Sequence, residues 1–397
     1  MVLIIGSGAG GSTVALELAK SGIPVTIIEK GPMIKTGKAY KCYQPTDNYL
    51  DLLNTVCVGG STLVSAGNAM ATSSDYMKNL GINLSKELKE IKIQLNIKEL
   101  PDSHFGLGTL KIMAAASSLG FNVRKMPKFI SPQKCKPCGN CSLGCPQDAK
   151  WTALDFLHEA EKHGAKILYN TPVNDIITKN GNVIGVKSHD KIFKSDIVIL
   201  ATGAITTPRI LQKLGLNAGK EFFMDTFVTV GGILEDIGYF EEVQMNALIE
   251  FEDYIISPHY SSLIFNELKK IGAKKSDILG LMVKIKDESA GRVEKDRIIK
   301  YNTLNDVKLL CEASTKAGTI LLKAGVDPKT IVSTPPRGAH PGGTAPIGKI
   351  VNKNLETEIK GLFVGDASVL PNSPGMPPII TIIALAKRLA EHIISHN

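Results

Sequence analysis

The first thirty residues contain two short apolar runs separated by a segment with helical spacing. Residues 2–5 form a continuous apolar stretch, as expected of a strand buried on both faces of a parallel sheet. Residues 12–22 place apolar side chains at intervals of three and four, which predicts a helix that ends at Gly22. Residues 23–28 return to a strand-like composition. This order predicts a β-α-β unit.

Later segments show both kinds of pattern. Residues 245–257 and 278–288 have strand-like character, whereas residues 306–325 have the spacing of one long helix. The C-terminal stretch 377–394 is strongly apolar but contains Lys387 and Arg388. These charges predict a buried amphipathic helix and no membrane span.

Length and charge limit the number of domains and the kinds of partner that the protein can have. The chain has 397 residues, of which 43% are hydrophobic, so two or three domains with a sizeable core are expected. The net charge of +8 is spread along the sequence, and no nucleic-acid motif is present. Met1 leads directly into an apolar run without a basic leader, which predicts a cytoplasmic protein. A basic surface would suit an acidic electron carrier such as a ferredoxin.

The glycines after the first strand indicate a dinucleotide site. Gly6, Gly8 and Gly11 have the spacing GxGxxG between a predicted strand and a predicted helix. Gly6 permits a tight turn, Gly8 lets the backbone approach a pyrophosphate, and Gly11 allows close packing of helix and strand. Glu29 ends the second strand and is placed to accept hydrogen bonds from ribose hydroxyls. These residues by themselves leave FAD and NAD open.

Three further segments carry a family resemblance. They are VGGSTLVSAGN at residues 58–68, DIVILATGAITTP at 196–208, and the C-terminal pair HPGGTAPIG and GLFVGDASVLP at 340–348 and 361–371. In this order they resemble the glucose–methanol–choline (GMC) oxidoreductases. The resemblance covers both ends of the chain and is vague between residues 235 and 330.

The resemblance implies that the cofactor is FAD. It places cofactor contacts at Gly59, Gly60, Ser61, Asn68, Val173, Gly203 and Asp366. Gly59, Gly60 and Ser61 would line the flavin and pyrophosphate, Asp366 would hold the ribityl–phosphate region, and Val173 would flank the adenine. The residue types agree, because glycine amides suit phosphate oxygens and a carboxylate suits sugar hydroxyls.

The resemblance also implies a chemistry. The family passes a hydride from a carbinol carbon to the flavin while a base takes the hydroxyl proton. His340 falls on the first catalytic histidine of the family and is expected to be that base. The family's second position is His or Asn, but Pro377 stands there, without a side-chain donor or a backbone N–H. His259 is the leading candidate for the missing partner, ahead of Tyr260 and Asn246.

A cysteine run is the remaining motif. Its spacing C-x2-C-x2-C-x3-C-P comes from Cys135, Cys138, Cys141 and Cys145. Thiolates at this spacing suit one iron–sulfur cluster, with Gly139 and Gly144 relieving the backbone, whereas zinc sites usually use two distant CxxC pairs. We expect a [4Fe–4S] cluster. The alternatives are a [3Fe–4S] cluster, a fourth ligand from elsewhere (Cys42, Cys57 or Cys311), and a zinc ion that only staples the loop.

These observations combine into one expected architecture, an α/β fold. A discontinuous Rossmann-like FAD-binding domain would carry a smaller α+β substrate domain built on an antiparallel sheet. The expected segments are an FAD-binding domain in 1–70, 150–235 and 335–397, a helical connection in 71–134, a cluster loop in 135–149 and a substrate domain in 236–334.

Three functions follow. The first is an FAD-dependent dehydrogenase that oxidises a CH–OH group of a small molecule, with the cluster passing electrons singly to a protein acceptor such as ferredoxin. The second is a reductase of a carbonyl or activated double bond that is fed by reduced ferredoxin. The third is an electron-transfer subunit of a larger complex.

Overall fold

The first apolar run forms the central strand of a five-stranded sheet in the computed structural model, which describes residues 1–45, 51–72 and 75–396. The sheet order is β18-β9-β1-β2-β5, and every pairing is parallel. Its strands are β1 (Val2–Ile5), β2 (Val25–Ile28), β5 (Lys166–Leu168), β9 (Ile197–Leu200) and β18 (Leu362–Val364). All residues of β1 and β2 are buried, because layers of chain cover both faces of the sheet.

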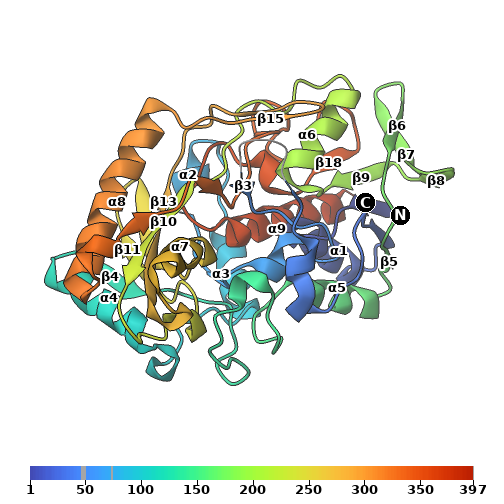
Figure 1. Cartoon of the computed structure of the whole chain (residues 1–397). Coiled ribbons are helices and arrows are strands. Elements are labelled where there is room, and N and C mark those ends of the chain that lie inside the picture. Colours follow the sequence, from blue (N-terminus) through green and yellow to red (C-terminus); the bar gives the residue numbers. More distant parts are fainter. Residues whose placement is uncertain (46–50, 73–74, 397) are drawn as a thin grey trace.

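Three helices pack together beside this sheet. α1 (Ala9–Lys20) contacts both α5 (Ala153–Lys162) and α9 (Ile379–Ser395), and Figure 1 shows α9 running through the centre of the molecule. The apolar C-terminal stretch is therefore a buried helix. Its Lys387 ammonium lies 2.6 Å from the Glu17 carboxylate of α1. No helix in the described ranges is both long and apolar enough to cross a bilayer.

An eight-stranded sheet forms the second layer. Its order is β3-β17-β10-β13-β12-β11-β4, with β16 also paired to β10. The pairings are antiparallel except that of β17 with β3. The strands are β3 (Asp51–Leu52), β4 (Val123–Lys125), β10 (Phe227–Ile233), β11 (Ala247–Glu250), β12 (Tyr254–Pro258), β13 (Ile278–Ile285), β16 (Val332–Ser333) and β17 (Arg337–Gly338).

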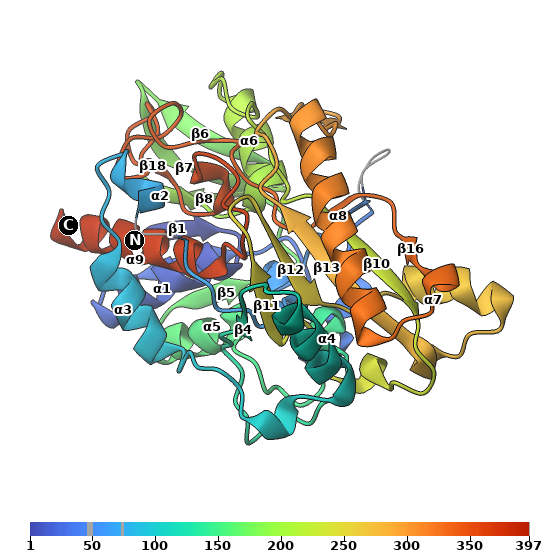
Figure 2. The same cartoon turned by 90° about the vertical axis from the view of Figure 1, so that its left-hand side faces the viewer.

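A long helix covers one face of the larger sheet. α8 (Leu304–Ala324) packs on β13, β10 and β12, and α4 (Leu107–Ser118) packs on α8, as Figure 2 shows. α8 begins at a capping box in which Thr303 and Asp306 satisfy each other's backbone N–H groups, and it ends at Gly325 in a left-handed conformation. The helix predicted over residues 306–325 is therefore present, beginning two residues earlier and ending one residue earlier than predicted.

The remaining elements are short. β6 (Asp175–Lys179), β7 (Asn182–Ser188) and β8 (Lys191–Lys194) form an antiparallel sheet, and β14 (Arg292–Val293) pairs with β15 (Ile298–Ile299). The other helices are α2 (Asp75–Lys78), α3 (Ser85–Gln94), α6 (Gly203–Lys213) and α7 (Ser262–Leu268).

The larger sheet takes strands from several of the expected segments. β3, β10 and β17 come from parts expected in the FAD-binding domain, and β4 comes from the expected helical connection. The chain therefore crosses repeatedly between the two sheets. This brings the carboxyl ends of β1 and β2 to the same cavity as residues of β10 and β13.

Candidate active site

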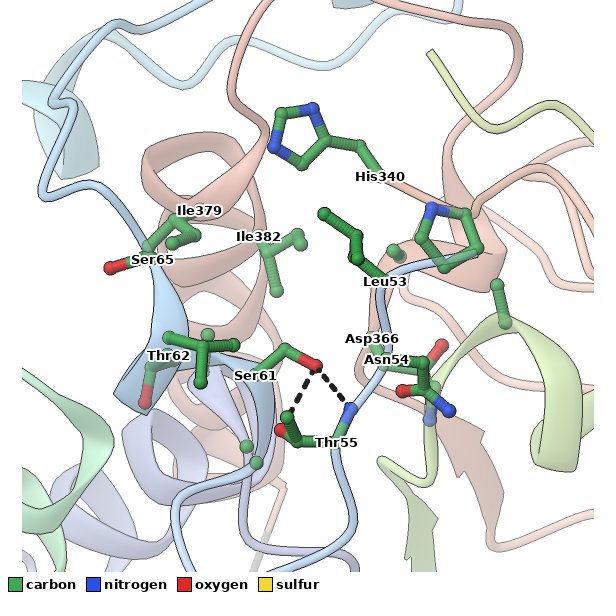
Figure 3. Close-up of a pocket in the computed structure, with 18 of the residues that line it drawn as sticks. Leu53, Asn54, Thr55, Ser61, Thr62, Ser65, His340, Asp366, Ile379 and Ile382 are labelled. Carbon is green, nitrogen blue, oxygen red and sulfur yellow. Dashed lines mark hydrogen bonds between the residues drawn. The ribbon is translucent and has the colours of Figure 1, made fainter. Parts of the chain in front are cut away.

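A single large cavity contains most of the predicted site residues. Its wall includes the turn after β1, the end of β2, residues 53–68, the start of α6, and residues next to β10 and β13. Figure 3 shows His340 at one end of this cavity and Thr55 and Ser61 at the other. The cavity wall includes most of the predicted cofactor residues, namely Gly6, Gly8, Glu29, Gly60, Ser61, Asn68, Val173, Gly203 and Asp366.

The dinucleotide turn has the backbone that its glycines predict. Gly6 has a φ of +97°, which favours glycine. A Cβ at Gly8 would meet no atom within 4 Å and would enter the open cavity. Gly11 does not line the cavity, and a Cβ there would lie 2.1 Å from the Gly6 carbonyl oxygen. Gly11 is thus needed for close packing, and Gly8 leaves room for a ligand beside the start of α1.

Glu29 connects this turn with the second glycine loop. Its Oε2 accepts hydrogen bonds from the Ser7 backbone N–H at 3.0 Å and the Ser7 hydroxyl at 2.6 Å, and its Oε1 accepts one from Gly31 N–H at 2.7 Å. The Ser7 hydroxyl oxygen in turn accepts a hydrogen bond from Gly59 N–H at 3.0 Å. Gly59 therefore supports the cavity from behind its wall.

Asp366 holds the opposite side of the cavity. Its Oδ2 accepts hydrogen bonds from Gly203 N–H at 2.8 Å and the Thr207 hydroxyl at 2.6 Å, and its Oδ1 accepts one from Ser368 N–H at 2.8 Å. Burial raises the pKa of this carboxyl, whereas the bonds from Ser368 and Thr207 oppose that rise. Gly203 therefore acts by fixing Asp366 as well as by lining the cavity.

Two polar groups between these ends can meet a ligand. The Ser65 hydroxyl lines the cavity, is buried, and has no hydrogen-bond partner among the described residues. Asn68 also lines the cavity, and its Oδ1 accepts a 2.6 Å hydrogen bond from the buried Lys128 ammonium.

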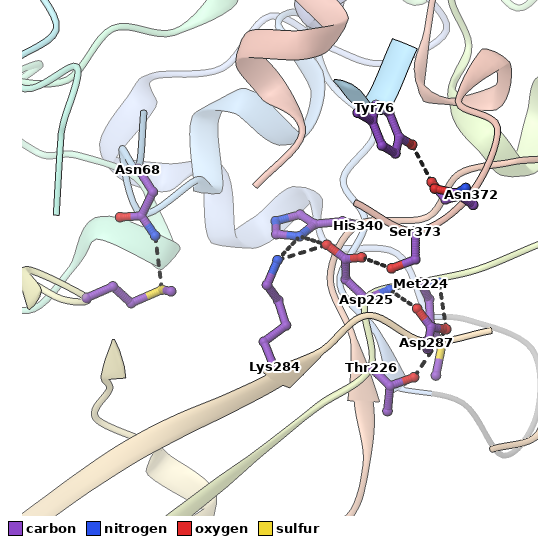
Figure 4. A network of polar contacts seen from close by, with 11 residues as sticks. Asn68, Tyr76, Met224, Asp225, Thr226, Lys284, Asp287, His340, Asn372 and Ser373 are labelled. Carbon is purple, nitrogen blue, oxygen red and sulfur yellow. Dashed lines mark hydrogen bonds and ion pairs between the residues drawn. The ribbon is translucent and has the colours of Figure 1, made fainter. Parts of the chain in front are cut away.

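His340 lies at the other end of the cavity, and one of its two ring nitrogens is hydrogen-bonded. Its Nδ1 lies 2.9 Å from Asp225 Oδ2, so the Nδ1–H donates to the carboxylate and Nε2 is left as the acceptor. Burial and the Lys284 charge lower the pKa of His340, and Asp225 opposes this. Figure 4 shows the three side chains together. A neutral imidazole with a free acceptor nitrogen is suited to take a proton.

His259 and Pro377 also line the cavity. The His259 Nδ1 lies 3.1 Å from the Thr229 hydroxyl oxygen, and burial lowers the pKa of His259 to about 4. Tyr260 lies outside the cavity wall, and Asn246 donates to the His104 carbonyl oxygen at 3.1 Å. His259 therefore remains the candidate partner among the three residues that the sequence offered.

Lys284 and Asp225 were not predicted from the sequence. Lys284 lines the cavity, and Asp225 holds His340. One signal was available, since Lys284 interrupts the apolar run of β13, in which all eight residues are buried. A charged residue inside such a run has either a buried partner or a function.

Comparison of the sequence with known protein families identifies the family of this chain. Two family models described as GMC oxidoreductase match residues 2–236 and 293–386. The chain belongs to the GMC oxidoreductase family. The family resemblance expected from the motifs is therefore confirmed.

Several proteins resemble this GMC oxidoreductase along nearly its whole length. An uncharacterized protein of Methanocaldococcus jannaschii is 37% identical over 98% of this chain and 99% of its own. The long-chain-alcohol oxidase FAO3 of Arabidopsis thaliana is 24% identical over 99% of this chain and 67% of its own. The crystal structure of pyridoxine 4-oxidase from Mesorbium loti superimposes with a TM-score of 0.77 at 16% identity, covering 100% and 99% of the two chains. The predicted α/β fold class is confirmed.

The cavity fits the FAD that the family implies. The open space at Gly8 and the Glu29 and Asp366 carboxylates suit a dinucleotide. This GMC protein is an FAD-dependent oxidoreductase.

The four cysteines of the predicted cluster loop line a second, small pocket. The backbone N–H of Ala149 points at the Cys145 sulfur at 3.2 Å. Burial and the three neighbouring thiols raise the pKa of Cys135 to about 12. Among the described residues, however, no group of three or more His, Cys, Asp or Glu side chains is arranged so that it could hold a metal ion. The donor types fit a cluster and the arrangement does not, so the cluster stays a prediction.

The cysteine loop adjoins the flavin cavity. Ser142 follows Cys141 and lines the large cavity, where the Tyr43 hydroxyl donates to its carbonyl oxygen at 2.8 Å. Lys150 donates to the Cys141 carbonyl oxygen at 2.7 Å and to that of Ser65. Cys42, Cys57 and Cys311 do not line the cysteine pocket.

Proposed function

We propose that this protein is an FAD-dependent dehydrogenase that oxidises a CH–OH group, with His340 as the base. The observation that carries this is the position of His340 in the cavity wall, where Nδ1 is held by Asp225 and Nε2 has no hydrogen bond to any described residue. The names of two relatives, long-chain-alcohol oxidase and pyridoxine 4-oxidase, agree with an oxidised organic substrate.

The residues near His340 suggest how an alcohol is handled. FAD, when bound, accepts the electron pair and hydrogen of the carbinol C–H bond as a hydride. His340 Nε2 accepts the hydroxyl proton, and Asp225 stabilises the imidazolium that forms. Phe227, Met245 and Met282 form an apolar cluster that lines this region of the cavity. This wall excludes water and favours a substrate whose carbinol lies next to an apolar group.

The test is anaerobic reduction of the bound flavin by a panel of alcohols, followed at the flavin absorbance. At least one alcohol should bleach the wild-type flavin. His340→Ala should slow the bleaching by a factor of about 100 to 10,000, the range for a lost general base. His163→Ala, at an exposed position, is the matched control. Equal rates in His340→Ala and wild type would refute the assignment of the base.

A finer form of this proposal includes the cysteine loop. We propose that Cys135, Cys138, Cys141 and Cys145, which are not arranged to hold a metal ion as the structure has them, come together around an iron–sulfur cluster of the [4Fe–4S] type, which would supply one-electron transfer. Its place supports this, because Ser142 belongs to both the cysteine loop and the flavin cavity. Leu143 beside it is 47% exposed, which would allow a carrier such as ferredoxin to approach.

Two buried lysines give the cysteine pocket a suitable charge. Lys128 and Lys150 are buried, and the hydrogen bonds of their ammonium groups to described residues all go to uncharged carbonyl and amide oxygens. Burial lowers the pKa of Lys128 to about 7 and that of Lys150 to about 8, and the nearby cysteines oppose this. Uncompensated buried cations are unfavourable. A cluster held by four thiolates is anionic and would compensate them.

Anaerobic purification with iron, sulfide and flavin quantitation tests the cluster. About four irons per FAD are expected, with an EPR signal on reduction. Cys138→Ser should lose iron, whereas Cys311→Ser, at an exposed position on α8, should keep it. Zinc or no metal in the wild type would refute the cluster and leave the alcohol oxidation standing.

A further inference from the structure

Lys284 places a buried ammonium group beside the proposed base. The residue lies on β13, and its side chain is 1% exposed. Its Nζ lies 2.8 Å from Asp225 Oδ2 and 3.4 Å from His340 Nδ1. The same carboxylate oxygen therefore contacts both the ammonium group and the imidazole (Figure 4).

Asp225 is held from all sides. Its Oδ1 accepts a 2.6 Å hydrogen bond from the Ser373 hydroxyl, and its backbone N–H donates to Asp287 Oδ1 at 2.8 Å. Its φ of +48° lies in the left-handed region that a non-glycine residue rarely adopts. Such a conformation persists only where the surroundings fix it. The carboxylate therefore has one position relative to His340.

The charges around His340 show how Lys284 affects the protonation of the imidazole. Without it, a buried carboxylate beside an imidazole would favour the imidazolium, which is no base. The Lys284 charge already compensates that of Asp225. The other charged or titratable groups nearby have partners of their own. Asp287, which accepts the Asp225 backbone N–H, pairs with Lys300 at 2.9 Å, and Lys300 also contacts Asp306 at 3.4 Å. Tyr76 donates to the Asn372 carbonyl oxygen, and Arg337 pairs with Asp51 at 2.5 Å.

We propose that Asp225 and Lys284 are positioning residues of this active site. Asp225 fixes the Nδ1–H tautomer of His340, and Lys284 compensates the Asp225 charge, so that His340 is kept neutral with its Nε2 lone pair in the cavity. Lys284 thus supplies a polar group in the cavity wall, to which Pro377 contributes none. This inference rests on the proposed function, since it concerns the base of that reaction.

The test measures protonation of His340 directly. In histidine Cε1 hydrogen–deuterium exchange, mass spectrometry of peptic peptides gives the inflection pH of each imidazole in the FAD-loaded protein. Lys284→Met should move the His340 inflection up by about one to three pH units, as expected when an opposite charge is left uncompensated. Lys284→Arg keeps the charge and should leave the inflection near its wild-type value. The exposed His163 serves as the internal reference.

Two further variants keep the proposal testable if Lys284→Met does not fold. Asp225→Asn should move the His340 inflection down, because the favourable carboxylate is gone while Lys284 stays. The double variant with Lys284→Met and Asp225→Asn lacks the ion pair, and its His340 inflection should also move down. An unchanged inflection in Asp225→Asn, or in folded Lys284→Met, would overturn the proposal.

The same variants separate this inference from the proposed function. If alcohols reduce the flavin, the reduction rate will fall below a certain pH as His340 is protonated. In Lys284→Met that pH should rise together with the inflection pH of the exchange. If no alcohol reduces the wild-type flavin, the proposed function fails. The exchange inflections still decide whether Asp225 and Lys284 set the protonation of His340.

Discussion

Gly10 packs so closely on Gly365 that a Cβ at Gly10 would lie 1.6 Å from the Gly365 carbonyl oxygen. This contact joins the start of α1 to the strand end that carries Asp366, and so brings the two halves of the cofactor cavity together. A Cβ at Gly8, two residues earlier, would meet nothing within 4 Å.

The two glycines should therefore respond differently to alanine. Gly10→Ala should lower the melting temperature and prevent stable FAD retention, because the added methyl group forces α1 away from residue 365. Gly8→Ala should fold like the wild type but bind FAD more weakly, because its methyl group enters the cavity. Thermal unfolding and flavin content after gel filtration measure both effects. Equal melting temperatures in the two variants would contradict the packing argument.

Glu29 should contribute to FAD affinity. Its carboxylate holds the Ser7 hydroxyl and the backbone of the dinucleotide turn, and it lines the cavity. Replacing one charged hydrogen-bond acceptor typically costs about 1.5–3 kcal/mol, so Glu29→Gln should weaken FAD binding by a factor of about 10 to 100. Calorimetric titration of the flavin-free protein measures this. Glu358→Gln, at an exposed position, should bind FAD like the wild type.

Lys150 should connect flavin binding with the cysteine loop. Its ammonium bonds the carbonyl oxygens of Ser65 and Cys141, which belong to the two neighbouring sites. Lys150→Met removes both bonds and should reduce FAD retention and increase alkylation of the cysteines by iodoacetamide. Lys134→Met, at an exposed position beside the same loop that does not line the cysteine pocket, should change neither. Unaltered alkylation in Lys150→Met would show that the loop does not depend on this residue.

His259 should make stability depend on pH below neutrality. Its pKa is lowered to about 4 in the folded protein, chiefly by burial, and is about 6.5 in an unfolded chain. Between these values the unfolded chain binds a proton that the folded protein does not, so the free energy of unfolding falls as the pH drops from 6.5 to 4. The full effect is about 3 kcal/mol.

Urea unfolding of wild type and His259→Asn at several pH values checks this. The variant should lose less stability than the wild type between pH 6.5 and 4. The exposed substitution His163→Asn is the control and should follow the wild type. Parallel pH profiles for wild type and His259→Asn would refute the buried neutral imidazole.

Much of the cofactor site was predictable because it is local in the sequence. The run of residues 2–5, the glycines at 6, 8 and 11, and Glu29 lie within one β-α-β unit, where spacing along the chain fixes position in space. The HPGGT segment likewise marked His340, which does line the cavity. The apolar pattern of residues 377–394 gave the buried helix α9.

The partners of His340 were decided only by the tertiary structure. Asp225 lies 115 residues before His340, and Lys284 lies 59 residues after Asp225. They meet because β10 and β13 pair antiparallel with Phe227 opposite Lys284. Strand register depends on contacts across the whole sheet, so no spacing in the sequence reveals it. The sequence by itself determined the glycine turn and marked His340, and the pairing of distant strands decided which charges surround His340.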